Sequence, residues 1–250
     1  ENRLYRIACG ARNDDYRSPV AMWTDVTTKR PANPRAWSNL AQSAIEAGDV
    51  DTSVAAARTA LALDPANADA HLHLARALAE RGEYGEADAH SAEAIRLKPG
   101  SPDAHNNRGA ALADQKRYAE AEPYYREALR LRPDYAEAMN NLGVAVMQRG
   151  AYDEAATLFA DAIRLRPDYA EPESNLGNLY ARQGRNADAI AAYQRALAIR
   201  PDYAAVHFNL AIALLQANRR DEALAHARDA LRLRPDLAPL VRQAGLTPPR

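Results

Sequence analysis

Prolines recur every 34 residues along most of the chain, and this interval constrains the fold more than any other feature. The members of the series are Pro31, Pro65, Pro99, Pro133, Pro167, Pro201 and Pro235. Between two of them, residues 136–165 contain two runs with apolar residues three or four positions apart, the spacing of one helix face. Gly150 separates the runs where a helix needs a left-handed residue to end. Each unit is therefore predicted to be helix, tight turn, helix and proline.

Several other positions carry similar residues in the successive units. The first helix holds a pair such as Leu142-Gly143, and the second holds a small residue, a variable slot and an unvarying alanine, as at Ala155, Phe159 and Ala162. Over about residues 32–235 this pattern resembles the tetratricopeptide-repeat family. The resemblance implies an all-α fold, an α-solenoid in the form of a right-handed superhelix with about six to seven helix-turn-helix units.

The same interval sets the expected domain boundaries. Six full repeats are expected between a degenerate first copy or cap and a short capping helix with a tail. The expected segments are 1–31 for the N-terminal copy or cap, 32–65, 66–99, 100–133, 134–167, 168–201 and 202–235 for the repeats, and 236–250 for the capping helix and tail.

Three local features lead to further expectations. Lys116 occupies the turn position that holds glycine in four units, so we expect a strained left-handed residue there. Arg108 occupies a leucine position, and we expect it to turn outward with its stem on the surface. A D-x-x-E pattern opens two units, at residues 134–137 and 168–171, and predicts a capping box at the start of the first helix.

The composition excludes several classes of partner. The 250 residues carry 32 basic and 33 acidic side chains, with a net charge of −1, and no basic stripe with interleaved aromatic residues. Cys9 is the only cysteine, so an internal disulfide is impossible. No run of about 18 apolar residues is present. We therefore expect no nucleic-acid partner and no membrane span in this segment.

The sequence contains none of the common catalytic motifs, such as HExxH, GxSxG, a phosphate-binding glycine loop or C-x-x-C. His71, His105 and His207 occupy a first-helix slot that is usually used for packing, and His90 and His226 lie on second helices, where we expect them to be solvated. No carboxylate or cysteine cluster joins the first two histidines at ligand spacing. We expect no metal site, no cofactor and no enzymatic activity.

The first helices of such an array line its concave wall, and the family resemblance implies that this wall binds peptides. A column of amides, interrupted by one histidine, precedes the leucine position of each unit. Its members are Asn39, His73, Asn107, Asn141, Asn175 and Asn209. Amide side chains both donate to and accept from an extended backbone without reading its sequence. The similar array of O-linked N-acetylglucosamine transferase uses an asparagine ladder in this way.

Four other wall residues complete the predicted peptide-binding set. Arg76 is a candidate cation, and Asn178 adds an amide near the column. Phe208 and Ile212 make the C-terminal end of the wall apolar, so a partner side chain is expected to anchor there. The alternatives are ordinary core packing for these two apolar residues and simple family consensus for the asparagines.

A second resemblance lies in residues 11–36. It is to the junction in bacterial polytopic membrane proteins with a C-terminal repeat array, some of which are similar to protein O-mannosyltransferases. The residues that carry it are Arg12-Asn13, Tyr16-Arg17-Ser18, Trp23 and Asp25. It implies a membrane-spanning part upstream and a periplasmic or membrane-tethered array in a bacterium, and the chain, which begins at Glu1, is expected to be a fragment. The alternative is that these residues cap the solenoid, which leaves the compartment open.

Three hypotheses for the function follow. The first is a protein–protein interaction scaffold that binds an extended peptide or partner segment in the concave groove. The second is an accessory domain that presents a protein acceptor to a larger membrane-bound glycosyltransferase-like protein. The third is a self-association module, which would make the chain an oligomer. Groove residues set a preference and do not name the partner.

Overall fold

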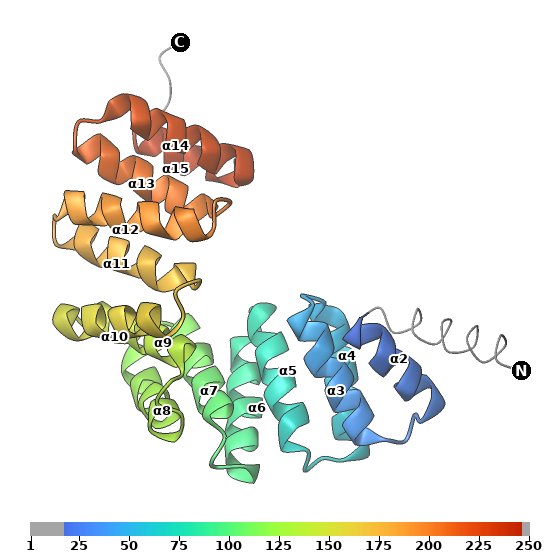
Figure 1. Cartoon of the computed structure of the whole chain (residues 1–250). Coiled ribbons are helices and arrows are strands. Elements are labelled where there is room, and N and C mark those ends of the chain that lie inside the picture. The colour runs from blue at the N-terminus through green and yellow to red at the C-terminus, as the bar shows by residue number, and fades with distance from the viewer. Residues whose placement is uncertain (1–17, 247–250) are drawn as a thin grey trace, which may run out of the picture. The chain divides into compact units, whose positions relative to one another are not determined.

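The computed structural model describes residues 18–246, and within this range the chain forms fourteen α-helices, one 3₁₀ turn and no strand (Figure 1). The predicted all-α class is therefore confirmed. The elements are α2 (Pro19–Lys29), α3 (Pro34–Glu46), α4 (Val50–Leu63), α5 (Ala68–Glu80), α6 (Tyr84–Leu97), α7 (Pro102–Asp114), α8 (Tyr118–Leu131), α9 (Ala136–Gln148), α10 (Tyr152–Leu165), α11 (Ala170–Arg182), α12 (Asn186–Ile199), α13 (Ala204–Gln216), α14 (Arg220–Leu233), η1 (Pro235–Leu237) and α15 (Ala238–Gln243). The expected tail, 247–250, and most of the junction residues lie outside the described range.

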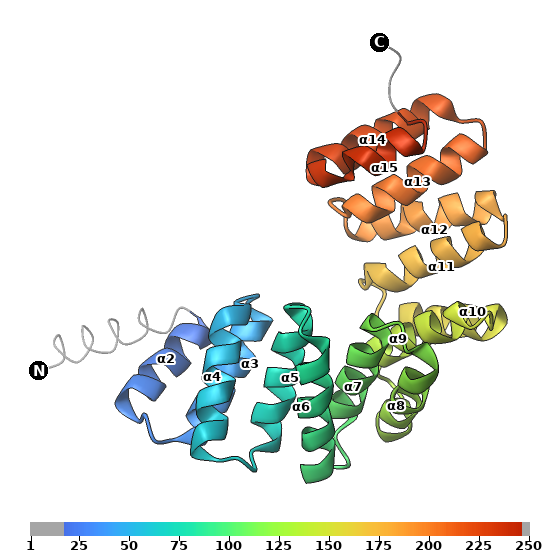
Figure 2. The same ribbon diagram turned by 180° about the vertical axis from the view of Figure 1, so that it is seen from behind.

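Consecutive helices pack in pairs within two compact units, Glu1–Pro133 and Asp134–Arg250. In the first unit α3 packs with α4, α5 with α6 and α7 with α8, and α2 packs against α3. In the second unit the pairs are α9 with α10, α11 with α12 and α13 with α14, and η1 follows against α14. Figure 2 shows the same pairing from behind. Stacked helix pairs of this kind are typical of a solenoid.

The turn within each pair contains one residue in the left-handed region, as the sequence predicts. Glycine takes this position in four repeats, and two other residue types take it in the remaining two. The residues are Gly48, Gly82, Lys116, Gly150, Gly184 and Asn218. Lys116 adopts φ 62°, a conformation that a lysine side chain disfavours, so its turn stores strain.

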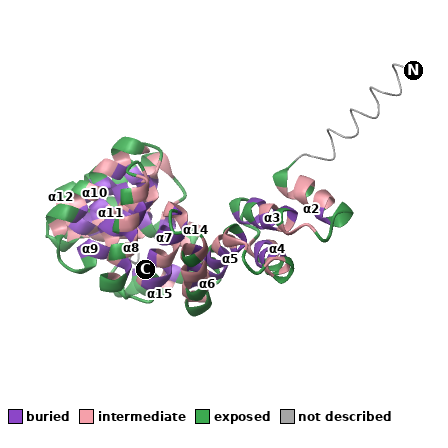
Figure 3. Ribbon diagram, turned by 90° about the horizontal axis from the view of Figure 1, so that it is seen from below, coloured by how far each residue is buried: buried purple, intermediate pink, exposed green. Residues whose placement is uncertain are grey.

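The two helices of a pair approach each other at one repeated position. A Cβ added at Gly143 would lie 2.6 Å from a ring carbon of Phe159, closer than side-chain packing permits. Where the second helix holds a small residue at this place, the first helix holds alanine instead. In chain order the pairs are Ala41 with Ala57, Ala75 with Ser91, Gly109 with Tyr125, Gly143 with Phe159, Gly177 with Tyr193, and Ala211 with Ala227. Every described helix carries buried residues, so burial is distributed along each unit (Figure 3).

An ion pair joins the start of the first helix to the residue that follows the second helix of the same repeat. The carboxylate of Glu137 lies 3.1 Å from the guanidinium of Arg166, and that of Glu171 lies 2.9 Å from Arg200. The predicted capping boxes are therefore wrong. Helices α9 and α11 begin after Tyr135 and Tyr169, whose side chains make no capping bond, and the glutamates of the expected boxes pair with the arginines.

Arg108 also differs from its prediction, because it is half-buried rather than turned outward. Its Nε donates to Oδ1 of Asp88 at 2.9 Å, and its guanidinium carbon lies 4.6 Å from the centre of the Tyr124 ring. Asp88 is on α6 and Tyr124 is on α8, so an arginine at a leucine position connects two repeats of the first unit.

Replacing Gly143 with alanine should lower the free energy of unfolding by about 1–3 kcal/mol, because the added Cβ would overlap the Phe159 ring. The overlap outweighs the gain of about 1 kcal/mol that alanine brings to a helix interior. Urea unfolding followed by circular dichroism measures the change. Gly85, a helical glycine in α6 with open space around it, provides the control, and Gly85→Ala should stabilise the chain or leave it unchanged. A Gly143→Ala protein as stable as the wild type would refute the steric assignment.

Candidate functional site

The predicted peptide-binding residues all lie on first helices of the repeats. All are half-buried except Arg76, which is exposed. In the first unit they are Asn39 on α3, His73 and Arg76 on α5 and Asn107 on α7; in the second they are Asn141 on α9, Asn175 and Asn178 on α11, and Phe208, Asn209 and Ile212 on α13.

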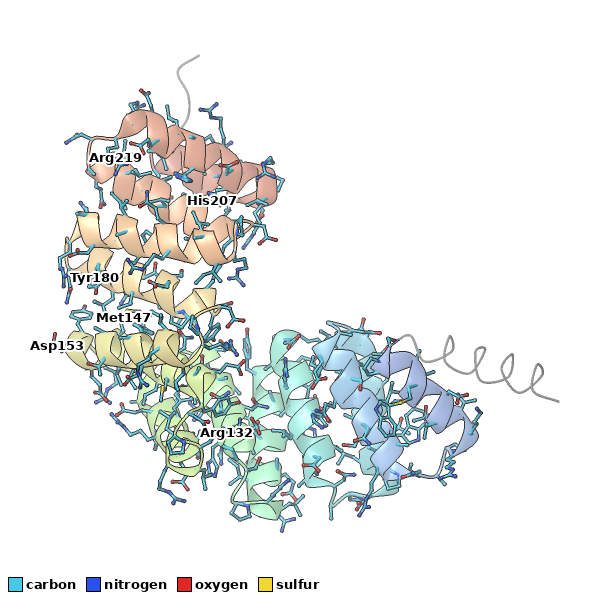
Figure 4. The ribbon with its side chains drawn as sticks, viewed as in Figure 1. Arg132, Met147, Asp153, Tyr180, His207 and Arg219 are labelled. Carbon is cyan, nitrogen blue, oxygen red and sulfur yellow. The ribbon has the colours of Figure 1, made fainter. Side chains whose placement is uncertain are left out.

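Four of these residues come together around a hollow of about 360 Å³ in the second unit, among α9, α11, α12 and α13. They are Asn175, Asn178, Asn209 and Ile212. The hollow is also lined by residues that the predicted set omits, namely Val144, Met147, Gln148, Ala181, Arg182, Tyr193, Ala213 and Gln216. Figure 4 labels Met147. Several of the omitted residues could have been found from the sequence, because they stand one helical turn after a wall position and so share its face.

The amides of the hollow are hydrogen-bonded to one another across repeats. Asn175 Nδ2 donates to Asn140 Oδ1 at 2.9 Å, and Asn209 Nδ2 donates to Asn178 Oδ1 at 3.0 Å. The hydroxyl of Tyr193 also donates to Asn178 Oδ1, at 2.9 Å. Burial raises the pKa of Tyr193 to about 12, so this hydroxyl keeps its proton near neutral pH. The asparagine column thus links neighbouring repeats of the second unit.

These bonds orient the amides and determine which atoms remain for a ligand. Asn178 accepts both of its bonds through its oxygen, which leaves its two N–H groups. Asn175 and Asn209 each donate one N–H in these bonds, which leaves their oxygens as acceptors together with a second N–H on each. The face therefore combines acceptors with donors, and an extended peptide backbone carries complementary N–H and C=O groups.

The other predicted residues are placed differently. Arg76 Nε lies 3.5 Å from the Glu80 carboxylate. Burial lowers the pKa of His73, and the nearby Asp69 only partly opposes this effect, so the ring is neutral near pH 7. Phe208 packs against the apolar core of the last repeats and does not line the hollow, whereas Ile212 does both.

Two histidine pairs contradict the expectation that second-helix histidines are solvated. His71 Nδ1 lies 2.9 Å from His90 Nδ1, and His207 Nδ1 lies 3.0 Å from His226 Nδ1. Both second-helix rings are half-buried because each fills space opposite a first-helix histidine of its own repeat.

Part of the membrane-protein resemblance falls on α2. Ser18 caps this helix by accepting a bond from the backbone of Ala21, Trp23 packs against the core of the first repeats, and Asp25 lies 2.7 Å from Lys29. Residues 11–17 lie outside the described range. Among the described helices, none has the length and apolar character needed to span a bilayer.

Stability should fall when the pH is lowered through the histidine range. Burial lowers the pKa of His90 below its usual 6.5; His71 and Arg58 lower it further, and Glu86 opposes them. The unfolded chain therefore takes up a proton at higher pH than the folded chain, so stability is full above about pH 6.5 and decreases below it. The thermal unfolding midpoint of the full chain should decrease from pH 7 to pH 5.

A His90→Tyr variant tests the assignment of this effect. Tyrosine stands opposite His105 in the next repeat, so the fold accepts it at this position. The variant should lose less stability than the wild type over the same pH interval. An equal loss in both proteins would show that His90 is not responsible.

Comparison with family models supports the repeat organisation. One model described as tetratricopeptide repeat matches residues 38–102, 89–136 and 107–170, and a second with the same description matches residues 168–236. A search of curated protein sequences found no significant match.

Solved structures with this fold include three informative neighbours. A chain of the APC/C hetero-tetramer Cut9–Hcn1 has a TM-score of 0.80 at 20% identity, over 89% of this chain and 45% of that chain. PilF of Pseudomonas aeruginosa has a TM-score of 0.66 at 24% identity, over 81% and 92%. YrrB has a TM-score of 0.55 at 23% identity, over 79% and 97%. This chain thus spans less than half of the first neighbour, and at these identities the likeness concerns the fold alone.

Three findings agree: the 34-residue interval, the packed helix pairs and the family models that together match residues 38–236. The positions of the turns and of the small residues between paired helices follow the same pattern. The chain belongs to the tetratricopeptide-repeat family.

Proposed function

We propose that this chain is a protein–protein interaction scaffold that binds an extended segment of a partner on the first-helix face of its second unit, and that it has no chemistry of its own. Tetratricopeptide-repeat proteins are generally non-catalytic scaffolds. The neighbour YrrB is a protein of this family with an unusual peptide-binding site. The accessory-domain and self-association hypotheses stay predictions, because no contact within residues 18–246 favours either.

The observation that carries the proposal is the fixed set of donors and acceptors in the hollow. The oxygens of Asn175 and Asn209 accept, and the N–H groups of Asn178 donate. Bonds within the protein already orient these amides, so a partner backbone meets a preorganised surface and less conformational entropy is lost on binding. Hydrogen bonds to the backbone allow different partner sequences to bind.

The apolar lining supplies the second part of the recognition. Val144, Met147 and Ile212 line the hollow together with the amides. Its volume of about 360 Å³ lies at the lower end of the ~300–1,000 Å³ found for ligand sites. One apolar side chain of the partner therefore fits better than a large cofactor. Arg182 is exposed at the same hollow, where its Nη1 donates to Gln148 Oε1 at 3.0 Å, and it favours an acidic residue beside the apolar one.

An Asn178→Asp variant tests this mode of binding. Aspartate keeps an oxygen for the bonds from Tyr193 and Asn209 but replaces the two N–H donors, so the surface should lose these donors while its own network persists. The tightest peptide selected from a library by the full wild-type chain should bind the variant roughly 10-fold more weakly. Isothermal titration calorimetry measures both dissociation constants.

Gln194→Glu is the matched control. It makes the same change from an amide to a carboxylate at an exposed position of α12 that does not line the hollow, and it should leave the affinity unchanged. Unchanged affinity in the Asn178 variant would remove the hollow from the binding site. Equal weakening in both variants would indicate a general effect of charge. A simple Asn175→Ala change is less informative, because it also removes the bond to Asn140 between two repeats.

A further inference from the structure

The last repeat brings together three side chains that can bind a metal ion. His207 lies on α13, and His226 and Asp229 lie one helical turn apart on α14. One ligand atom from each residue lies within 4.8 Å of the other two. Figure 4 labels His207, and the group lies outside the hollow described above.

The hydrogen bonds of His207 fix its tautomer. Its Nε2 lies 2.9 Å from the carbonyl oxygen of Pro201, which only accepts, so Nε2 carries the proton. Nδ1 is therefore unprotonated, and its lone pair points at Nδ1 of His226, 3.0 Å away. Histidines that bind metals commonly donate their other ring N–H to a carbonyl oxygen in this way.

The second histidine becomes a ligand after a change of tautomer and a small turn of the rings. When the proton of His226 moves to Nε2, both Nδ1 lone pairs are available, and the two rings must turn so that the lone pairs converge on an ion beside the line that joins the two nitrogens. Two nitrogens about 2.0–2.1 Å from a tetrahedral ion lie about 3.3 Å apart, so the nitrogens themselves must separate by only a few tenths of an ångström.

The carboxylate completes the set and leaves access for an ion. The side chain of Asp229 is 43% exposed, whereas His207 is buried. An ion can therefore enter from the solvent side and keep a water molecule as its fourth ligand. Two imidazoles with one carboxylate suit zinc and its first-row neighbours better than calcium or magnesium, which prefer sites built of oxygen.

We propose that His207 Nδ1, His226 Nδ1 and a carboxylate oxygen of Asp229 form a binding site for a divalent first-row transition ion at the end of the repeat array. The bound ion would join the two helices of the terminal pair. Nothing in the amino-acid pattern alone indicated this site, because its ligands belong to two helices.

The second repeat contains a natural control with the same two imidazoles. His71 and His90 face each other at 2.9 Å, and His71 Nε2 lies 3.1 Å from the carbonyl oxygen of Pro65. The histidine geometry therefore repeats four units earlier in the chain.

The two repeats differ in the state of the acidic residue. Glu93 stands where Asp229 stands in the last repeat, and Arg96 Nε contacts both of its oxygens, at 3.1 and 2.9 Å. Asp229 has one longer contact, 3.4 Å, with Arg232. Glu93 is thus paired with Arg96. The histidine pair of the second repeat should therefore bind an ion more weakly than the group in the last repeat.

Titration of the untagged, metal-free full chain with Zn²⁺ by isothermal titration calorimetry tests the proposal. We expect one Zn²⁺ ion to bind tightly to each chain. The thermal unfolding midpoint should rise by several degrees, because the ion binds only the folded chain. Co²⁺ in place of Zn²⁺ should give the visible absorption of a four-coordinate nitrogen–oxygen site.

His226→Tyr should weaken this tight binding by at least ~100-fold, since loss of outer-shell partners alone costs ~10–100-fold. The variant should fold, because tyrosine already faces His105 in the third repeat, with ring centres 6.3 Å apart; circular dichroism checks this. Asp229→Asn should weaken binding about 10-fold, and His90→Tyr should leave the tight binding intact.

Two results would overturn the proposal. The first is the absence of stoichiometric Zn²⁺ binding by the wild-type chain at micromolar concentration, in which case the histidines form only a hydrogen-bonded packing contact. The second is unchanged binding by a folded His226→Tyr variant, which would place any bound ion elsewhere.

Discussion

The distance of closest approach between the two helices of each pair governs the rest of the structure. A glycine on the first helix lets an aromatic ring of the second helix lie directly on the backbone of the first, as the Tyr193 ring lies on Gly177. This contact positions the tyrosine hydroxyl beside the next residue, Asn178, where it donates a hydrogen bond. Phe159 occupies the same place in the preceding repeat and has no hydroxyl. One packing constraint therefore determines both the spacing of the helices and the orientation of an amide on the wall.

A second pair of positions also brings the two helices of a repeat into contact. A first-helix position and the second-helix position nineteen residues later carry different combinations of side chains from one repeat to the next, and side chains at the two positions meet in the repeats that hold His71 with His90, His105 with Tyr124 and His207 with His226. The combinations are Trp37 with Ala56, His71 with His90, His105 with Tyr124, Met139 with Leu158, Glu173 with Ala192, and His207 with His226. Two of the buried polar members form hydrogen bonds through one atom each: Glu173 Oε1 accepts a bond of 2.8 Å from Arg195, and His105 Nε2 lies 3.0 Å from the carbonyl oxygen of Pro99.

Local signals explain why the sequence predicts so much of this fold. Proline ends helices, glycine at Gly150 supplies a left-handed turn, and apolar spacing marks a helix face, and each of these effects acts within a few residues. Which side chains of different helices contact one another is not set by such local signals. The surroundings of His90, the ion pair of Arg108 and the use of Glu137 by Arg166 depend on distances between helices and on competition among partners. The local sequence pattern does not determine these distances or this competition.

The same distinction applies to the candidate site. The position of an amide on the wall follows from the repeat, so Asn175 and Asn209 were expected to face the same side. Their bonds to amides of neighbouring repeats, and the hollow beside them, result from how adjacent units pack. Arg182 and Gln216 share the wall face because each stands one turn after a wall position, whereas the hollow that they border results from the packing of adjacent units.

The side-chain oxygen of Asn178 accepts two hydrogen bonds, and this has a consequence for any extended peptide that lies along this wall. The amide cannot rotate by half a turn without breaking its bonds to Tyr193 and Asn209, so its polarity is locked. In an extended chain, equivalent groups on one edge and side chains on one face recur every second residue. If a partner strand binds here as proposed, a shift by one residue would bring its N–H group against the N–H groups of Asn178, so the strand would shift by two residues at a time. The proposed wall would then contact alternate side chains of the partner.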